Sequence, residues 1–392
     1  MIGLWDTTGN EVVKALAAER RSAGGVTSGL ALTLVAVVDE RRVREAEAAA
    51  TIAAAQHPCR LVIVVRAEGT MSDRSRLDAE IVVGGRLGPC EAVVLRMQGR
   101  LALHAESVVQ PLLAPDVPVV SWWHSEPPQK IANDPLGVYS DRRVTDSAQS
   151  SDPIAALQTR AVDYAPGDTD LAWCRITPWR TLVAGAFDTI ESPVTSATVT
   201  APASDPTAAL MRGWLGSRLG HMPRLKATSE FPRMREVSLH CANGDNISLT
   251  RDNDSAVLKR TGQIDRDLPL TRRPLGDELA EELRRLDADE IYAAALGAFA
   301  GVKKLNERPA TRVHIWQDPA VSEAPEAVTK PPARSKSAVA ARSGKRRPTV
   351  SARARAAGTD AAPRTSDTKT AARTSGTDAA ARTSGDGKAA SR

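Results

Sequence analysis

The spacing of two carboxylates separated by one residue suits acid–base or metal chemistry better than that of any other pair in this sequence. Asp168 and Asp170 follow Pro166 and Gly167, a pair that is typical of a turn. Neighbouring carboxylates can exchange protons with a substrate or bind a cation. The same residues also suit the start of a helix, where Asp168 would cap the first amides and the helix dipole would favour Asp170. We favour the helix start, because capping explains both residues without any further group.

An imidazole and a thiol, at His57 and Cys59, have the spacing of a nucleophile with its base. Pro58 fixes the backbone between them, and residues 61–65 are apolar, as in a buried strand. We therefore expect a helix end next to a core thiol. The four cysteines are too far apart in sequence for a zinc site or a disulfide framework, which favours free thiols in a reducing compartment. They are Cys59, Cys90, Cys174 and Cys241. We predict no bound metal and no cofactor.

Motifs that would identify a catalytic mechanism are missing from the sequence. Gly24-Gly25 precedes a predicted strand, and the glycines at 84, 85 and 88 lie between two strands, so both groups indicate turns and not a dinucleotide fingerprint. The sequence contains no P-loop, no G-x-S-x-G nucleophile elbow, no H-E-x-x-H helix and no kinase signature. We therefore predict no catalytic residue.

Tryptophans are concentrated in two segments of a chain with only 3% aromatic residues. Trp122 and Trp123 end one predicted strand, and because adjacent strand residues face opposite ways, the two indoles cannot enter the same core layer. Trp173 and Trp179 lie in the segment 164–180, where Thr177-Pro178 indicates a second helix start. Tryptophan is enriched at interface hot spots. Three roles therefore stay open for Trp122 and Trp123: packing within the chain, contact with a partner, and a platform on which a sugar stacks.

The segment 164–180 has the character of a docking element. From Trp179 to Phe187, apolar residues recur at the spacing of one helix face, and two arginines bracket the break between the two helical pieces. We predict that the partner interface includes Trp122, Trp123, Asp168, Asp170, Trp173, Arg175, Trp179 and Arg180.

The first 124 residues have the pattern of an α/β domain with a mixed sheet. A capping box at Thr8–Glu11 starts a helix, and the apolar run 30–38 is typical of a strand covered on both faces. An Ala-rich helix to about Gln56 is long enough for a parallel crossover to the next strand. Further strands are expected at 79–83, 92–97 and 117–123, with a helix at 102–113.

A polar connection, 125–152, precedes a second domain, which we expect to be α+β. Alternating apolar residues on both sides of Asn243-Gly244 predict a hairpin, and a strand at 256–259 would extend it into an antiparallel meander. Other expected elements are helices within 153–187, a strand at 194–199 and helices at 206–219, 277–286 and 289–299. The predicted organisation is thus 1–124, an α/β domain; 125–152, a linker; 153–320, an α+β domain; and 321–392, a tail.

The C-terminal tail explains the basic character of the chain. Residues 329–392 contain 15 Lys and Arg but only 4 Asp and Glu, so the tail has a net charge of +11. Since the whole chain has a net charge of +5, residues 1–328 together carry −6. Four Arg-led nonapeptides fill residues 355–390, and apolar residues larger than Ala are nearly absent, so we expect disorder. Nucleic-acid binding could come only from this tail, which has no aromatic residue to stack on bases, and we do not expect it.

No segment reads as a signal peptide or a membrane span. The N-terminus has no basic region followed by an apolar one, and the longest apolar run, 30–38, is far shorter than a bilayer requires. We expect a cytoplasmic protein without membrane contact.

Four segments, in this order, resemble one known family: Leu30–Val38, His57–Arg60, Pro118–Trp123 and Pro166–Arg180. They are similar to OpcA proteins, the glucose-6-phosphate dehydrogenase assembly proteins of the oxidative pentose phosphate pathway, in their actinobacterial form. The likeness extends over roughly Leu4–Pro319, and Pro166–Arg180 is its specific part. It leaves out the repetitive tail.

This resemblance implies an assembly factor or allosteric effector that binds and activates glucose-6-phosphate dehydrogenase through protein–protein contact, and not an enzyme. It brings no list of active-site residues. Two alternatives from other classes remain. One is a sugar-phosphate-binding enzyme with a tryptophan platform and arginine clamps, and the other is a nucleic-acid or scaffold protein that acts through its basic tail.

Overall fold

The structure is a computed structural model of the 392-residue chain, and it describes residues 1–23, 29–66, 74–84, 90–188 and 190–310. The predicted tail with its nonapeptides, the turn at Gly24-Gly25 and the glycines 85 and 88 lie outside these ranges. The described residues belong to one compact unit. None of the helices within it is long and apolar enough to cross a bilayer.

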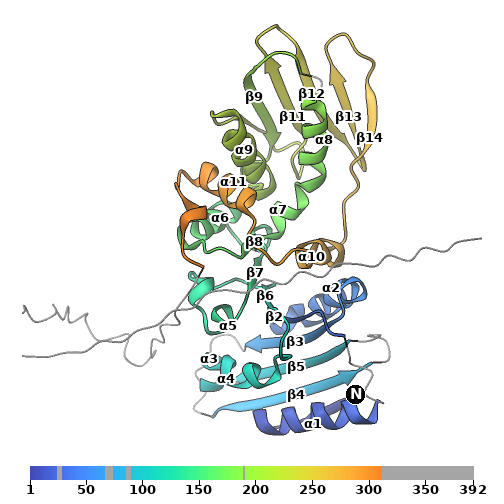
Figure 1. Cartoon of the computed structure of the whole chain (residues 1–392), viewed down its shortest axis with the longest axis vertical. Helices are drawn as coiled ribbons and strands as arrows, with labels where there is room; N and C mark the ends of the chain where they lie inside the picture. Colours follow the sequence, from blue (N-terminus) through green and yellow to red (C-terminus); the bar gives the residue numbers. More distant parts are fainter. Residues whose placement is uncertain (24–28, 67–73, 85–89, 189, 311–392) are drawn as a thin grey trace, which may run out of the picture. The chain divides into compact units, whose positions relative to one another are not determined.

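An eight-stranded mixed sheet, called sheet A here, confirms the predicted α/β class of the N-terminal part (Figure 1). Six neighbouring strands are parallel, and two further strands complete one edge, each antiparallel to the strand beside it. In spatial order the strands are β1 (Ile2–Leu4), β4 (Arg76–Val83), β5 (Glu91–Gln98), β3 (Cys59–Arg66), β2 (Leu32–Val38), β6 (Val119–Trp123), β7 (Arg142–Thr145) and β8 (Asp168–Asp170).

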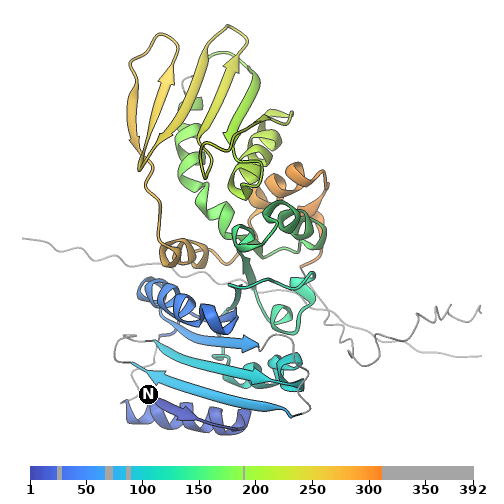
Figure 2. The same cartoon turned by 180° about the vertical axis from the view of Figure 1, so that it is seen from behind.

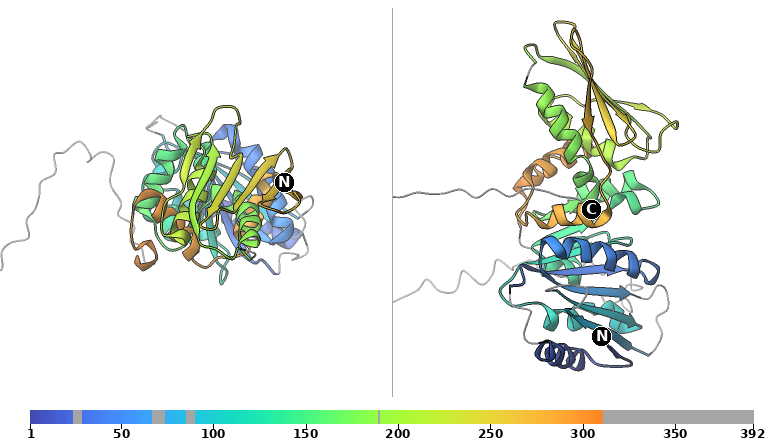
Figure 3. Two further views of the ribbon diagram at one scale, coloured as in Figure 1. Left: turned by 90° about the horizontal axis from the view of Figure 1, so that it is seen from above. Right: turned by 90° about the vertical axis from the view of Figure 1, so that its right-hand side faces the viewer.

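Helices cover both faces of sheet A, because its central strands are apolar on both sides. The helix α1 (Gly9–Ser22), which starts at the predicted capping box of Thr8, packs on one face with α4 (Ala105–Val109). The helix α2 (Val43–Gln56) packs on the other face, together with α10 (Leu275–Leu283) from much later in the chain. Figure 3 shows α1 and α2 on opposite sides of the strands.

A six-stranded sheet, sheet B, forms the second part, and it confirms the predicted antiparallel meander (Figure 2). The hairpin at Asn243-Gly244 joins its third and fourth strands, and Gly244 has the positive φ of +91° that such a turn needs. Only the edge strand β10 is parallel to its neighbour. In spatial order the strands are β10 (Arg224–Ala227), β9 (Val194–Ala201), β11 (Glu236–Cys241), β12 (Asn246–Asp252), β13 (Ser255–Arg260) and β14 (Arg266–Pro269).

One core joins sheet B to its helices. Alternate residues of β9, β11 and β12 pack against the buried faces of these helices. The packed helices are α6 (Pro153–Asp163), α7 (Leu171–Arg175), α8 (Thr177–Phe187), α9 (Pro206–Leu219) and α11 (Glu290–Ala300). Short remaining elements are α3 (Arg100–Leu103) and α5 (Pro135–Val138), and 3-10 turns at Glu40–Arg42, Gln110–Leu112, Ile131–Asn133, Ser147–Gln149 and Leu305–Glu307.

Sheet A extends across the predicted domain boundaries. Its strand β7 lies within 125–152, the segment expected as a linker, and β8 lies within 153–320. Both strands are short and polar, so neither apolar runs nor alternation mark them in the sequence. The division at residues 124 and 152 stays a prediction, but the hydrogen-bonded sheet itself does not end there.

Candidate functional site

The end of β8 holds Asp170 as the N-cap of α7. Asp170 Oδ1 accepts a hydrogen bond from the amide of Ala172 at 2.9 Å. Its Oδ2 accepts from Thr145 Oγ1 at 2.8 Å and from the amide and hydroxyl of Ser147 at 2.9 and 2.6 Å. Burial, and then the nearby charge of Asp146, raise the pKa of this carboxyl group. Among the described residues, the hydrogen bonds to this carboxylate come from neutral donors, which fits a structural cap.

Asp168 is not the helix cap that the sequence predicts, because it lies within β8 and faces an arginine. Its Oδ1 accepts a charged hydrogen bond from Arg143 of the adjacent strand β7, and its Oδ2 accepts from the amide of Ala165 at 2.7 Å. Gly167 turns the chain into the strand with φ +95°, and a Cβ there would lie 2.3 Å from the carbonyl oxygen of Asp141. The capping function therefore belongs to Asp170.

The four predicted interface tryptophans are buried, each at most 2% exposed. Trp122 and Trp123 enter different apolar clusters on opposite faces of sheet A, as the strand geometry predicts. Trp173 Nε1 donates to Asp289 Oδ2 at 2.8 Å, and Trp179 belongs to the predicted apolar face of α8. In this fold all four indoles pack against the chain's own residues.

Arg175 and Arg180 are the two predicted interface residues that are partly exposed. Arg175 lies between two carboxylates, donating to Asp146 at 2.6 and 2.8 Å and to Glu278 Oε2 at 2.9 Å. The Arg180 guanidinium lies 3.7 Å from the ring centroid of Trp173. The interface role of all eight residues stays a prediction, and only these two arginines could touch a partner directly in the described conformation.

The pair His57 and Cys59 does not form a catalytic dyad here. His57 Nε2 lies 2.9 Å from the carbonyl oxygen of Ala280 in α10. Cys59 is fully buried beside Cys90, and this contact, with burial, raises the pKa of its thiol. Among the described residues, no group of three or more His, Cys, Asp or Glu side chains is arranged to hold a metal ion.

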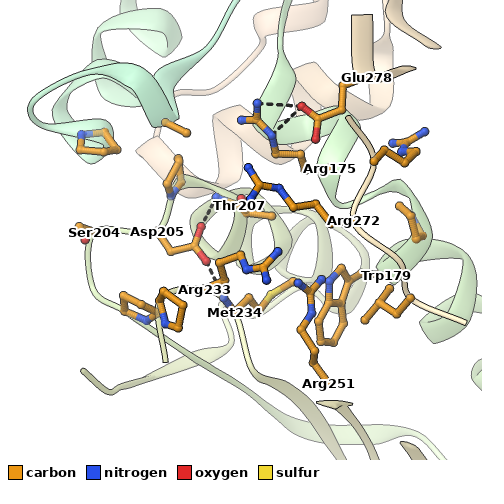
Figure 4. A pocket seen from close by; sticks show the side chains of 18 of the residues that line it. Arg175, Trp179, Ser204, Asp205, Thr207, Arg233, Met234, Arg251, Arg272 and Glu278 are labelled. Atoms are coloured by element: carbon orange, nitrogen blue, oxygen red, sulfur yellow. Dashed lines mark hydrogen bonds and ion pairs between the residues drawn. The ribbon is translucent and has the colours of Figure 1, made fainter. Parts of the chain in front are cut away.

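A cavity of about 570 Å³ opens beside α7 and α8 (Figure 4). Trp179 lines it together with the start of α9, where Asp205 caps the helix. Asp205 Oδ1 accepts from the amide of Thr207 at 2.8 Å, and its Oδ2 accepts from the amide of Met234 at 2.7 Å. Both oxygens of this carboxylate are therefore engaged by the backbone.

Three arginines dominate the charge of this space, which we call the three-arginine cavity. They are Arg233 before β11, Arg251 in β12 and Arg272 before α10, and Figure 4 shows their guanidinium groups turned toward one another. None of them forms an ion pair with a carboxylate within the part of the chain that the structure describes. The Arg251 guanidinium lies over Trp179, 5.3 Å from the ring centroid. Burial, and then the charge of Arg233, lower the pKa of Arg251.

Sequence reasoning missed this cavity. Its arginines lie about 20 residues apart in sequence and meet only through the fold of sheet B. One signal could have pointed to Arg251: it follows Ile247 and Leu249 at the alternation of two residues, which puts its side chain on the helix-covered face of the sheet. The chemistry that such a cavity offers is attraction and orientation of an anion.

A second cavity, of about 670 Å³, is lined by other residues of the α7–α8 segment. Trp173 and Arg180 line it, with charged residues of both signs from 281–290. The segment predicted as a docking element thus lines two cavities, with Trp179 in one and Trp173 in the other.

Comparison with known proteins gives two family matches in consecutive parts of the chain. Residues 50–162 match the family described as the N-terminal domain of the glucose-6-phosphate dehydrogenase subunit. Residues 166–296 match the family described as the C-terminal domain of the same subunit. Between them, the matched ranges contain most strands of sheet A and all of sheet B.

Two curated proteins, each described as a putative OxPP cycle protein OpcA, are similar to this chain. The protein of Synechococcus elongatus is 31% identical over 187 residues, which are 44% of this chain and 42% of the relative. The protein of Synechocystis sp. is 27% identical over 184 residues, which are 43% of this chain and 39% of the relative. The match thus spans less than half the length of either relative.

Proposed function

Because this chain belongs to the OpcA family of glucose-6-phosphate dehydrogenase assembly proteins, we propose that it binds glucose-6-phosphate dehydrogenase and activates it. The contact would be between proteins, in the oxidative pentose phosphate pathway, and the chain would catalyse no reaction of its own. The observation that carries this proposal is the pair of family matches, since both families are described as domains of a protein associated with this dehydrogenase.

The proposed activation needs a difference in affinity between two states of the dehydrogenase. An effector shifts such an equilibrium only by as much as it binds the active state more tightly, and a preference of about 1.4 kcal/mol shifts it tenfold. Ion pairs with buried carboxylates support a stiff effector: Arg175 joins Asp146, next to the 3-10 turn Ser147–Gln149, to Glu278 of α10. A stiff surface loses little conformational entropy when it binds, so more of its contact energy is available to favour the active state of the dehydrogenase over the inactive one.

The test is a titration of the full chain into glucose-6-phosphate dehydrogenase from the same organism. NADP reduction would be followed against glucose 6-phosphate concentration, with co-elution on a sizing column as a separate readout. We expect a saturable fall in KM or rise in kcat, and no turnover by the chain alone. Unchanged kinetics together with separate elution would refute the proposal, and turnover by the chain alone would refute its non-enzymatic part.

The predicted interface can be tested in the same assay. Arg180→Gln removes a charge from a partly exposed predicted residue, while Arg224→Gln removes the same charge from an exposed position in β10. If the α7–α8 segment contacts the dehydrogenase, Arg180→Gln raises the concentration needed for half-activation and Arg224→Gln does not. Equal behaviour of the two variants would place the contact elsewhere.

The sugar-phosphate-binding enzyme stays a second candidate, because Trp179 and the arginines of the three-arginine cavity supply the parts that it requires. It predicts turnover of a sugar phosphate by the chain without any dehydrogenase. The nucleic-acid alternative depends on the tail, which lies outside the described residues.

A further inference from the structure

We propose that the three-arginine cavity binds a phosphate group, either as free orthophosphate or as the end of a small phosphate monoester. The guanidinium groups of Arg233, Arg251 and Arg272 would hold the phosphate oxygens. This binding would be a property of the chain alone, so it neither requires nor implies a complex with a dehydrogenase.

The positive charge of the cavity is not balanced by its own carboxylates. Five arginines and two carboxylates line it. Of these arginines, Arg175 is paired with Glu278, and Arg273 forms an ion pair with Glu281. Asp205 is hydrogen-bonded to two backbone amides, and it attracts Arg251 through its charge without forming an ion pair with it. Arg233, Arg251 and Arg272 are left as like charges that share one space, and an anion would relieve their mutual repulsion.

Arg251 is the best placed of the three to orient a ligand. Its guanidinium lies over the indole of Trp179, 5.3 Å from the ring centroid, and this contact limits the positions that the group can take. Its Nε atom is buried and has no hydrogen-bond partner among the described residues. A ligand in the cavity cannot reach this buried atom, so the terminal nitrogen atoms of Arg251, which are not among the buried unpaired atoms, would donate to the phosphate oxygens.

The shape of the site favours a small ligand over an acidic protein segment. Its volume of about 570 Å³ lies within the usual range of small-molecule pockets. The planar fork of an arginine matches two oxygens of a phosphate, and three such forks can surround a doubly charged group. Trp179 adds an apolar wall against which the carbon skeleton of a monoester could pack.

The N-terminus of α9 is not what attracts the anion. Asp205 already caps this helix, so its carboxylate occupies the position that an anion would otherwise take. The proposal rests instead on three guanidinium groups that come from three separate segments and share one cavity without an ion pair among the described residues.

The experiment is isothermal titration calorimetry of the full chain at constant ionic strength. The probes are orthophosphate, glucose 6-phosphate and, as the uncharged control, glucose. The test variant is Arg233→Gln/Arg272→Gln, which changes two exposed side chains without ion pairs among the described residues and should therefore fold normally. The matched control is Arg224→Gln/Arg266→Gln, which removes two exposed arginines from the edge strands β10 and β14.

We expect saturable binding of at least one phosphate probe by the unaltered chain and none of glucose. The test variant should bind at least about tenfold more weakly, since each lost charged hydrogen bond weakens binding by that order, and the control variant should bind as before. Similar affinities for both phosphate probes would identify orthophosphate as sufficient, and a preference for glucose 6-phosphate would identify a monoester site.

Three results would overturn the proposal. They are no binding of either phosphate probe at millimolar concentration, unchanged binding by the test variant, and an equal loss in the test and control variants. The last would mean that net charge, and not this cavity, attracts the probes. Should the double variant melt early, the single variants Arg233→Gln and Arg272→Gln are compared with Arg224→Gln in the same way.

Discussion

Replacing Gly276 by alanine should loosen the contact through which α10 covers α2. A Cβ at this position would lie 2.5 Å from Ile52 Cβ, 2.8 Å from Ile52 Cγ2 and 2.9 Å from the carbonyl oxygen of Ala49. The first and last of these atoms cannot rotate away, so the two helices must move apart. Overpacking of this kind costs about 1–3 kcal/mol, and the higher helix propensity of alanine returns about 0.5–1 kcal/mol.

With the middle of each range, the net loss in the free energy of unfolding should be about 1 kcal/mol, which lowers Tm by roughly 2–4 °C in a protein of this size. Circular dichroism during heating, with urea unfolding as a second measure, would detect it. Gly185→Ala in α8 is the matched control, since Gly185 is an exposed helix residue whose new Cβ would meet no atom within 4 Å. This control should gain about 0.5–1 kcal/mol.

A Gly276→Ala protein as stable as the unaltered chain, alongside a stabilised Gly185→Ala protein, would refute the reasoning. It would mean that α10 does not approach α2 as closely as the packing of this side of sheet A requires.

Two further predictions concern groups buried where β7 and α7 meet α10. Glu282→Gln leaves the Arg142 guanidinium, which is 4% exposed, without its carboxylate, so urea unfolding should show a loss of about 3–5 kcal/mol; a loss below 1 kcal/mol, as at a surface pair, would contradict this. Burial raises the pKa of the Cys174 thiol to about 12, from its ordinary 9.0. Between pH 9 and 12 the thiol ionises in the unfolded chain but stays protonated in the folded one. The contribution of this thiol to the free energy of unfolding is therefore fully present below pH 9 and is lost as pH rises toward 12. Cys174→Ala should flatten this fall between pH 8.5 and 10.5 in melting curves, and equal slopes would count against the burial argument.

The sequence predicts the parts of the fold in which apolar patterning is strong. The run 30–38 becomes the buried strand β2, and the alternation around Asn243-Gly244 becomes the hairpin of β11 and β12. The helix α1 starts at its predicted cap, Thr8. These signals are local, so they can be read without knowing the fold.

The sequence fails to predict features in which tertiary contacts decide. Strand β7, Arg-Arg-Val-Thr, is buried because Glu282 and Asp168 neutralise its two arginines from distant positions. The helix cap is Asp170 and not Asp168 for the same reason, since only the neighbouring strand shows that Asp168 faces Arg143. The arginines of the three-arginine cavity likewise give no sign, in sequence, that they share one space.

The return of α10 to sheet A sets an order of events during synthesis. The apolar face of α2 is finished at Gln56, yet the helix that covers it begins at Leu275, after all of sheet B. At about 5–20 residues per second, a ribosome needs roughly 10–45 seconds to make the intervening chain. During this time the apolar face of α2 that α10 later covers is exposed to solvent, so a chaperone or an early partner could bind there.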